Sequence, residues 1–330
     1  MAWLKFKKTY RSPCRLGIAV FFLIFLLSGC VVTQQTKDFV VTSAGLGDTS
    51  ASLAARYLGD SSYGPIIEEF NQTSLFWPGR QLVVPLNLNR GGLYKDGYQV
   101  VPVLVYHGFT RDQSSKKMFV RQQDFEQQMR FLQDQGYTVV SLDRLYDFIE
   151  LKKPLPAKSV VITIDDGWCS LYEIAYPILK RYGYPATVFL YTDFISKEKC
   201  LNWQQLREMA ENGVDIQSHT RSHQNLNGPN ETESFSRYFS SVRKEIEEAE
   251  QTIETKLGDR PRFLAYPYGA YNDLVIAYLQ KRGYRGGVTV TRAANPFFVD
   301  PFKVNRSVIY GHYSLNDFKR NLVVFQRRDL

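Results

Sequence analysis

The chain has 330 residues, enough for two domains, and 44% of them are hydrophobic. Its formal net charge is +8, from 41 Lys and Arg against 33 Asp and Glu. Five of the basic residues and none of the acidic ones precede Cys30, so a chain that starts at Cys30 has 36 basic residues and a net charge of +3. Such a small excess argues against nucleic acid as a partner.

The N-terminal segment has the pattern of an export signal. Basic residues up to Arg15 precede an uncharged apolar run from Leu16 to Leu27, which is shorter than the roughly 20 residues of a membrane-spanning helix. The run ends in Leu27-Ser28-Gly29-Cys30, which resembles the lipobox of bacterial lipoproteins. The resemblance implies a signal peptide over residues 1–29, a lipid on Cys30, and a mature protein anchored in the bacterial cell envelope, facing the periplasm or the exterior. A plain secretory signal and a retained anchor helix are the alternatives.

Residues 39–86 form a self-contained segment, with two helical stretches between two short apolar ones. It contains Phe39-Val40-Val41, Gly47-Asp48-Thr49, Asn71 and a closing Pro78-Gly79-Arg80-Gln81-Leu82-Val83-Val84-Pro85. These features resemble a lysin-motif (LysM) module, a small βααβ domain. The resemblance implies a groove for glycans that contain N-acetylglucosamine, and a structural cap without a ligand is the alternative. The Gly-rich stretch 87–97 is predicted to be a linker.

From residue 98 to residue 330, apolar segments alternate with helical ones. Helical spacing is clear at Phe125, Met129 and Leu132. The predicted strands are 100–106, 137–140, 159–164, 186–191, 214–217, 262–266 and 286–290. Glycines that suit helix ends precede several of them, at Gly136, Gly183, Gly213, Gly258 and Gly283. Seven strands in β/α repeats predict an α/β fold, a distorted (β/α)7-type barrel, whose reactive groups lie at the carboxyl ends of its strands.

Carboxylates and imidazoles follow two of the predicted strands. Asp165 and Asp166 come directly after the strand 159–164, while His219 and His223 follow the strand 214–217. Two imidazoles and one carboxylate can hold a catalytic metal ion and leave a position for water, and the second carboxylate is then available as a base. The pattern predicts a metal-dependent hydrolase with a divalent ion, zinc in the first place and cobalt or nickel as alternatives.

Three motifs resemble those of the NodB-type polysaccharide deacetylases, carbohydrate esterase family four. They are Thr163-Ile164-Asp165-Asp166-Gly167, His219-Thr220-Arg221-Ser222-His223 and Tyr266-Pro267-Tyr268-Gly269. The resemblance implies that Asp166, His219 and His223 bind the metal. It also implies that Asp165 is the general base and that the backbone N–H of Tyr268 stabilises the oxyanion. The implied reaction removes N-acetyl groups from a polymer that contains N-acetylglucosamine, such as peptidoglycan or poly-N-acetylglucosamine.

The chain departs from the family pattern at two catalytic positions. His107, in a Tyr-His pattern similar to that of the poly-N-acetylglucosamine deacetylases, is the predicted acid that protonates the leaving amine, and His312 is the alternative. Ala265 stands where the family has an arginine that orients the base, and Arg306 is the predicted substitute. The lost arginine leaves a second interpretation, a glycan-binding lipoprotein whose barrel is inactive. Hydrolysis of a small non-sugar amide is a third.

Four further side chains have two interpretations each. Cys169 and Cys200 either form a disulfide in an oxidising compartment or stay as thiols. Trp203 and Tyr266, which lie near the motifs, either face the sugar or pack in the core.

Overall fold

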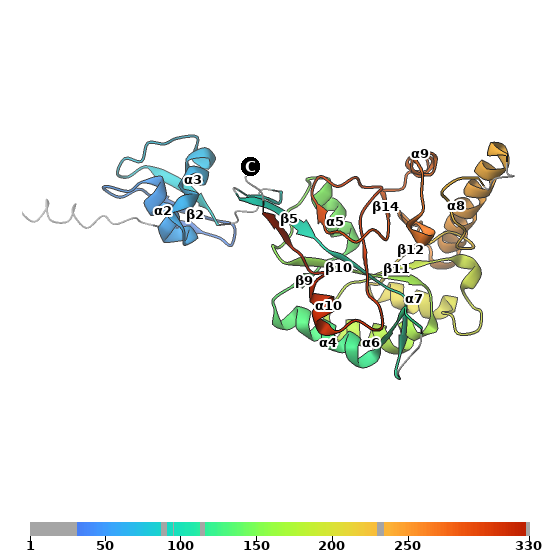
Figure 1. Ribbon diagram of the computed structural model, residues 1–330. Coiled ribbons are helices and arrows are strands. Elements are labelled where there is room, and N and C mark those ends of the chain that lie inside the picture. The colour runs from blue at the N-terminus through green and yellow to red at the C-terminus, as the bar shows by residue number, and fades with distance from the viewer. Residues whose placement is uncertain (1–31, 87–90, 95, 113–115, 230–233, 328–330) are drawn as a thin grey trace, which may run out of the picture. The chain divides into compact units, whose positions relative to one another are not determined.

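The computed structural model describes residues 32–86, 91–94, 96–112, 116–229 and 234–327. The chain divides into two compact units, Met1–Leu88 and Asn89–Leu330 (Figure 1). The predicted signal peptide over residues 1–29 and the predicted lipidation site Cys30 lie outside the described residues. Within the described part of the chain, no helix is both long enough and apolar enough to cross a membrane.

The N-terminal unit consists of a three-stranded antiparallel sheet, in the order β1-β2-β3, and two helices. Its elements are β1 (Val32–Gln35), β2 (Phe39–Ser43), α2 (Ser50–Leu58), the 3-10 helix η2 (Ser61–Tyr63), α3 (Gly64–Asn71) and β3 (Gln81–Pro85). From residue 39 on, the order is therefore strand, helix, helix, strand. The exposed strand β1 lies before the predicted segment 39–86, and it pairs with β2 through backbone groups that any residue carries.

Polar side chains fix the ends of both helices in this unit. Thr49 and Ser52 cap α2 reciprocally, since the hydroxyl of each accepts a hydrogen bond from the backbone N–H of the other. Asn71, at the end of α3, donates to the carbonyl oxygens of Ile67 and Val83 and accepts from the Val83 N–H. These bonds attach α3 to β3 beside a small apolar core formed by Val40, Ala44, Leu53, Ala54, Ile67, Leu82 and Val84.

A parallel sheet is the framework of the C-terminal unit, and its strands follow the order β14-β13-β12-β11-β10-β6-β16. These strands are β6 (Val103–Tyr106), β10 (Ser159–Asp166), β11 (Thr187–Leu190), β12 (Asp215–Ser218), β13 (Phe263–Ala265), β14 (Gly286–Val288) and β16 (Ser307–Val308). The sheet curls into a half-barrel, which fits the predicted distorted (β/α)7 barrel. Its two ends are joined by one stretch of chain, in which Val304 bridges to Val288 of β14 before the chain enters β16 beside β6. The predicted strand 137–140 contributes only the short β9 (Thr138–Val139), which pairs with the start of β10.

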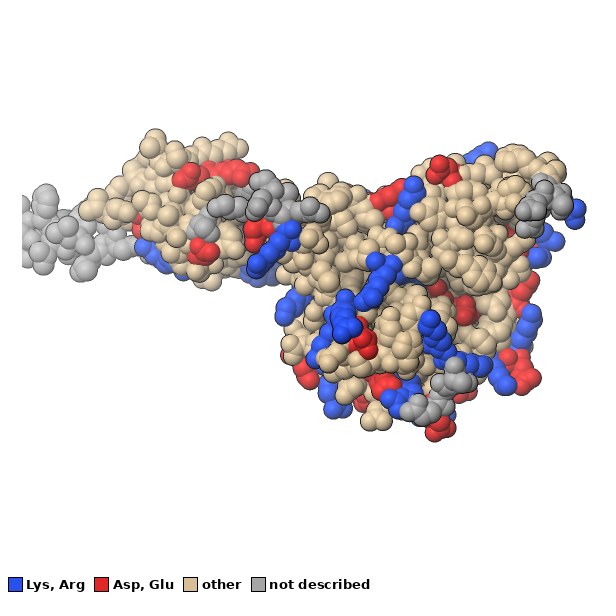
Figure 2. All heavy atoms as spheres, viewed as in Figure 1, with Lys and Arg blue, Asp and Glu red and all other residues tan. Residues whose placement is uncertain are grey.

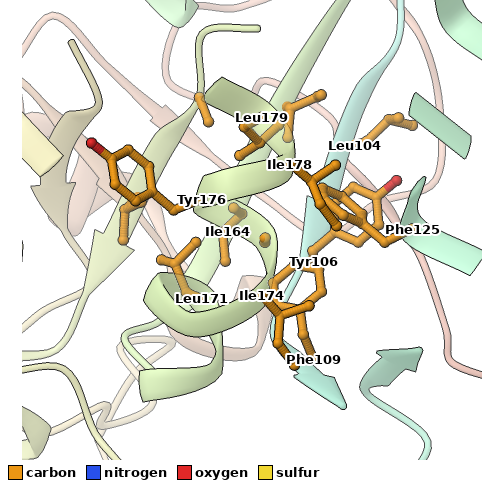
Figure 3. Close-up of a cluster of buried hydrophobic side chains, with 14 of the residues drawn as sticks. Leu104, Tyr106, Phe109, Phe125, Ile164, Leu171, Ile174, Tyr176, Ile178 and Leu179 are labelled. Atoms are coloured by element: carbon orange, nitrogen blue, oxygen red, sulfur yellow. The ribbon is translucent and has the colours of Figure 1, made fainter. Parts of the chain in front are cut away.

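Helices pack around this sheet (Figure 1). They are α4 (Gln122–Asp134), α5 (Leu142–Ile149), η3 (Leu171–Ala175), α6 (Tyr176–Tyr182), η4 (Thr192–Phe194), α7 (Trp203–Glu211), α8 (Phe235–Leu257), α9 (Asp273–Lys281) and α10 (Leu315–Lys319). The five glycines predicted at helix ends are confirmed, with φ between 64° and 88°. Figure 3 shows part of the core, where Tyr106 of β6 and Ile164 of β10 pack among Phe125, Ile174 and Leu179 from the helices. This packing fixes the two strands that carry most of the site.

The predicted linker 87–97 is wrong over its second half. Leu93–Tyr94 (β4) pairs antiparallel with Gly97–Val101 (β5), which also pairs with β15 (Asn295–Pro296) and β17 (Phe325–Arg327). Gly97 is needed for this packing, because a Cβ atom at that position would collide with the backbone oxygen of Gln326. The glycines that indicated a flexible linker therefore allow a hairpin and a close approach of two strands.

Charged side chains of the C-terminal unit are paired rather than segregated. Basic and acidic residues are interspersed on the face that Figure 2 shows. A cluster surrounds Arg285, whose guanidinium lies 2.7–2.9 Å from carboxylate oxygens of Asp143, Asp147 and Glu150. Hydrogen bonds from Arg285 lower the pKa of Glu150 to about 2. The cluster attaches α5 to the residue that precedes β14.

Candidate active site

The predicted site residues follow strands that end at the same edge of the parallel sheet. Asp165 and Asp166 end β10, His219 directly follows β12, and His107 directly follows β6. These side chains line one cavity of about 460 Å³. The rest of its lining is Lys116, Lys117, Met118, Phe119, Trp168, His223, Tyr266, Tyr268, Val290, Val308 and Tyr310. The residues that sequence reasoning grouped at strand ends therefore share one cavity.

Asp166, His219 and His223 form a possible metal site, with ligand atoms within 4.8 Å of one another. The Nε2 atoms of His219 and His223 lie 4.0 and 3.9 Å from Oδ1 of Asp166. An ion bound at about 2.0–2.2 Å from each ligand can link two atoms that are up to about 4.2 Å apart, and both Asp166–histidine distances lie within this limit. The structure thus brings the three predicted ligands together.

Hydrogen bonds to the outer atoms of two of these ligands fix their orientation. Nδ1 of His219 lies 2.8 Å from the carbonyl oxygen of Ala265. Because a carbonyl can only accept, Nδ1 carries the proton and Nε2 keeps its lone pair. Burial lowers the pKa of His219 to about 4, which favours the neutral imidazole. Trp168 donates its Nε1–H to Oδ2 of Asp166 at 3.1 Å, while Oδ1 faces the histidines. Sequence reasoning missed both partners.

Arg306 lies against the predicted base. Its Nη1 and Nη2 atoms lie 2.7 Å from Oδ1 and Oδ2 of Asp165, and the two residues are 0% and 1% exposed. Its Nε donates to the carbonyl oxygen of Thr289 at 2.8 Å, which fixes the plane of the guanidinium. Burial alone would raise the pKa of Asp165, but the charge of Arg306 and its hydrogen bonds outweigh burial and lower the pKa. Asp165 is therefore an ionised carboxylate with a fixed orientation.

Backbone strain is concentrated around this site. Of the eight non-glycine residues with positive φ in the described chain, four are Asp166, Thr220, His223 and Tyr268, with φ of 77°, 72°, 64° and 59°. Such conformations cost on the order of 1–3 kcal/mol each and persist where the surroundings hold them. The exposed ring of Tyr268 lies edge-on to the ring of His223. The backbone N–H of Tyr268 makes no hydrogen bond with another described residue. This N–H is the one that the family resemblance assigns to the oxyanion.

The two candidate acids lie in different places. His107 lines the cavity, and its buried Nδ1 has no hydrogen-bond partner among the described residues. His312 lines a separate hollow beside Arg121 and Asp124, and its ring stacks on Tyr310. The structure therefore brings His107 together with Asp165 and the three ligand residues, and it does not bring His312 there.

The aromatic wall of the cavity was missed by sequence reasoning. Tyr266 borders the cavity but is buried and donates its hydroxyl to the carbonyl oxygen of Phe302, and Trp203 packs against the hydrophobic core. Phe119 and Trp168 form the wall instead, with ring centroids 5.3 Å apart. Phe119 starts β8 (Phe119–Arg121), which pairs with β7 (Gly108–Thr110) directly after His107. This pairing across a loop leaves no periodic pattern in the sequence.

Cys169 and Cys200 are free thiols. Trp168 and Cys200 are directly opposite each other in an isolated antiparallel bridge. Because successive side chains in such a pair alternate between faces, Cys169 and Cys200 are expected on opposite faces. The register therefore gives no support to a disulfide between them.

Together, these features define a class of protein. A parallel half-barrel that carries an Asp/His/His group and a buried, arginine-bound carboxylate at its strand ends has the groups of a hydrolase. Residues 152–287 match the family model described as polysaccharide deacetylase.

Individual relatives agree with this class. YxkH of Bacillus subtilis (strain 168), named as a polysaccharide deacetylase, is 32% identical over 196 residues, which are 59% of this chain and 66% of YxkH. The poly-β-1,6-N-acetyl-D-glucosamine N-deacetylase of Staphylococcus epidermidis is 31% identical over 200 residues, which are 59% of this chain and 69% of that protein. The structure of the Streptococcus pyogenes deacetylase PplD in complex with acetate is similar, with a TM-score of 0.61, 26% identity and coverage of 69% of this chain and 99% of PplD. The chain belongs to the polysaccharide deacetylase family and is a polysaccharide N-deacetylase.

Proposed function

We propose that this chain is a lipid-anchored enzyme of the bacterial cell envelope that uses a divalent metal to remove N-acetyl groups from a polymer of N-acetylglucosamine. The observation that carries the proposal is the group Asp166, His219 and His223 beside the buried pair of Asp165 and Arg306, all close to one cavity. An inactive barrel, the reading that Ala265 left open, is disfavoured because Arg306 supplies the cation that the base needs.

Each side chain has a separate role in the proposed reaction. A divalent ion, when bound, polarises the acetamide carbonyl and acidifies water, and zinc suits two imidazoles and a carboxylate, with cobalt or nickel as alternatives. Asp165, held by Arg306, accepts the proton of the attacking water. The N–H of Tyr268 donates to the oxygen on which negative charge develops. His107 gives a proton to the leaving amine, so that the products are acetate and an amino sugar.

The substrate class is proposed from the relatives. The Staphylococcus epidermidis protein is named for poly-β-1,6-N-acetyl-D-glucosamine, which supports the same polymer here. Peptidoglycan is the second candidate, because its strands carry the same acetamido group.

Residues 39–86 are proposed to be a LysM-like module that binds this polymer. Two loops of the N-terminal unit lie side by side, since the Ala44 N–H donates to the Arg80 carbonyl and the Gly79 N–H donates to the Ala44 carbonyl, both at 2.8 Å. The exposed large apolar residues on these loops are Leu46, Leu75 and Trp77, at 86%, 66% and 53%. Apolar side chains gathered on adjacent surface loops are typical of a binding surface, and an aromatic ring suits the apolar face of a sugar.

The lipid anchor rests on the sequence alone. Cys30→Ser should abolish the incorporation of a labelled fatty acid and release the protein from the membrane fraction. Retention of Cys30→Ser in that fraction would instead support an N-terminal anchor helix.

Acetate release tests the proposed reaction. The mature enzyme is incubated with β-1,6-linked N-acetylglucosamine oligomers and, separately, with peptidoglycan. A chelator should abolish acetate release, and zinc or cobalt should restore it. Asp166→Ala should still bind the polymer through residues 39–86 and release no acetate. Undiminished release by the chelated enzyme or by Asp166→Ala would overturn the metal dependence, and no release from either polymer would overturn the substrate.

A further inference from the structure

The loop that carries both histidine ligands is strained and must be held in place. It runs from His219 to His223 between β12 and α8, and Thr220 and His223 have φ of 72° and 64°. Thr220 is β-branched, which makes this conformation especially unfavourable. In an unrestrained loop, relaxation of these two residues would move the imidazoles apart. Contacts from outside the loop must therefore stabilise the conformation that faces Asp166.

Glu245, on α8, supplies several of these contacts, and the N–H groups of Thr192 and Asp193 also donate to the carbonyl oxygens of Thr220 and Arg221. Its carboxylate accepts hydrogen bonds from the N–H and the hydroxyl of Ser222, at 2.8 and 2.7 Å, and it lies 3.4 Å from Nε of Arg221. Its backbone carbonyl accepts from the Arg221 N–H at 3.0 Å. Glu245 thus binds Arg221 and Ser222, which lie between the two histidines, through both its side chain and its backbone.

The burial of Glu245 distinguishes it from the other acids near this loop. Glu245 is 1% exposed, whereas Glu248 and Asp193, which also contact Arg221, are exposed. A buried carboxylate that accepts several hydrogen bonds holds its donors firmly, while exposed ion pairs contribute little. Glu245 contacts the loop from the side of α8, so it has no direct part in the reaction.

We propose that Glu245 is a positioning residue that holds His219 and His223 in the metal-binding conformation and thereby sets the affinity of the site for its ion. The inference rests on the proposed function, since it assumes that these histidines bind a metal. Replacing a residue that orients metal ligands without binding the metal itself typically weakens metal affinity by about 10–100-fold.

The test is a metal titration of the metal-free mature protein and its variants. Glu245→Gln keeps the size of the side chain but removes the charge and one acceptor oxygen, and we expect it to bind zinc or cobalt about 10–100-fold more weakly than the wild type. It should also change the absorption spectrum of the cobalt form, because the ligand geometry changes. Glu248→Gln, on the exposed side of the same helix, is the matched control and should titrate like the wild type.

A second measurement separates positioning from a general effect on folding. The melting temperature of each variant is measured with and without metal. If Glu245 only stabilised the fold, Glu245→Gln would lower the melting temperature equally with and without metal. The increase in melting temperature on metal binding would then equal that of the wild type, and this result would overturn the proposal. The milder Ser222→Ala, which removes one of the hydrogen bonds, should shift metal affinity in the same direction by a smaller factor.

Failure of this inference is distinguishable from failure of the proposed function. If the wild type binds metal no more tightly than Asp166→Ala, the metal site itself is refuted, and the role of Glu245 with it. If the wild type binds tightly and Glu245→Gln binds equally tightly, only the role of Glu245 is refuted.

Discussion

Arg306 and Asp165 are joined by two hydrogen bonds of 2.7 Å, although they lie 141 positions apart in the chain. Arg306 reaches Asp165 because the chain passes from Val304, beside β14, into β16, beside β6, and so joins the two ends of the half-barrel. Ala265, where the family pattern has an arginine, contributes its carbonyl oxygen to His219 instead. Asp165, the proposed base, thus has its cationic partner in the residue directly before β16.

Replacement of Arg306 should impair both catalysis and folding. In Arg306→Ala, Asp165 becomes an unpaired buried carboxylate, so we expect kcat/KM to fall more than about tenfold and the free energy of unfolding to fall by about 3–5 kcal/mol. Arg306→Lys should recover little, because an ammonium cannot make the bidentate contact. Acetate-release kinetics and urea denaturation measure the two effects. Arg320→Ala, at an exposed arginine, is the control. A kcat/KM of wild-type size in Arg306→Ala would exclude the orienting role.

The two histidines should behave differently when they are replaced. His107→Gln removes the proposed acid from the cavity, so turnover should fall by about 10²–10⁴-fold. His312→Gln should leave turnover close to that of the wild type, because His312 lines a separate hollow. Kinetics with N-acetylglucosamine oligomers make the comparison. The opposite pattern would assign the acid to His312.

Much of the site was predictable because parallel strands end at one edge of a sheet. His107, Asp165 and His219 each lie at or just after the end of a predicted strand, so the strand-end rule was sufficient to group them. The positions of these three residues in the sequence were therefore enough to predict that their side chains lie at one edge of the sheet. The rule does not account for Arg306, the predicted substitute for the arginine missing at Ala265, because Arg306 directly precedes β16 and does not follow a strand.

The remaining contacts depend on three-dimensional geometry that a sequence does not encode locally. The hydrogen bond from Trp168 to Asp166 forms across a turn in which Asp166 and Gly167 both have positive φ. The contact of His219 with Ala265 uses a backbone carbonyl, which every residue has. The strand β1 and the hairpin of β4 and β5 likewise form through backbone groups, without an apolar pattern to reveal them.

Glu150 should make the stability of the C-terminal unit dependent on pH. Arg285 lowers its pKa to about 2 in the folded protein, whereas an unfolded chain has about 4.3. Between these values the unfolded chain binds more protons, so the contribution is fully present above about pH 4.3 and is lost as the pH falls toward 2. The side chain is 24% exposed, so after allowance for solvent screening we expect a loss of about 1–2 kcal/mol.

Urea denaturation between about pH 6 and pH 3 measures the first part of this loss, which is complete only near pH 2. Glu150→Gln should reduce the slope of stability against pH. Glu211→Gln, at an exposed acid at the end of α7, should keep the slope of the wild type. Equal slopes in all three proteins would contradict the assigned role of the Arg285 cluster.

Trp77 should contribute to polymer binding and not to the chemistry. Its exposed ring lies under the guanidinium of Arg80, at 4.2 Å, on the loop that adjoins Leu46. Loss of an aromatic contact of about 0.5–1.5 kcal/mol should weaken binding of the full mature chain to the polymer by about two- to tenfold in Trp77→Ala. Turnover of short oligomers should stay unchanged, because the catalytic cavity belongs to the C-terminal unit. Phe298→Ala, at an exposed aromatic residue of that unit, is the control. Unchanged polymer binding in Trp77→Ala, or an equal loss in both variants, would refute a glycan-binding surface around Trp77.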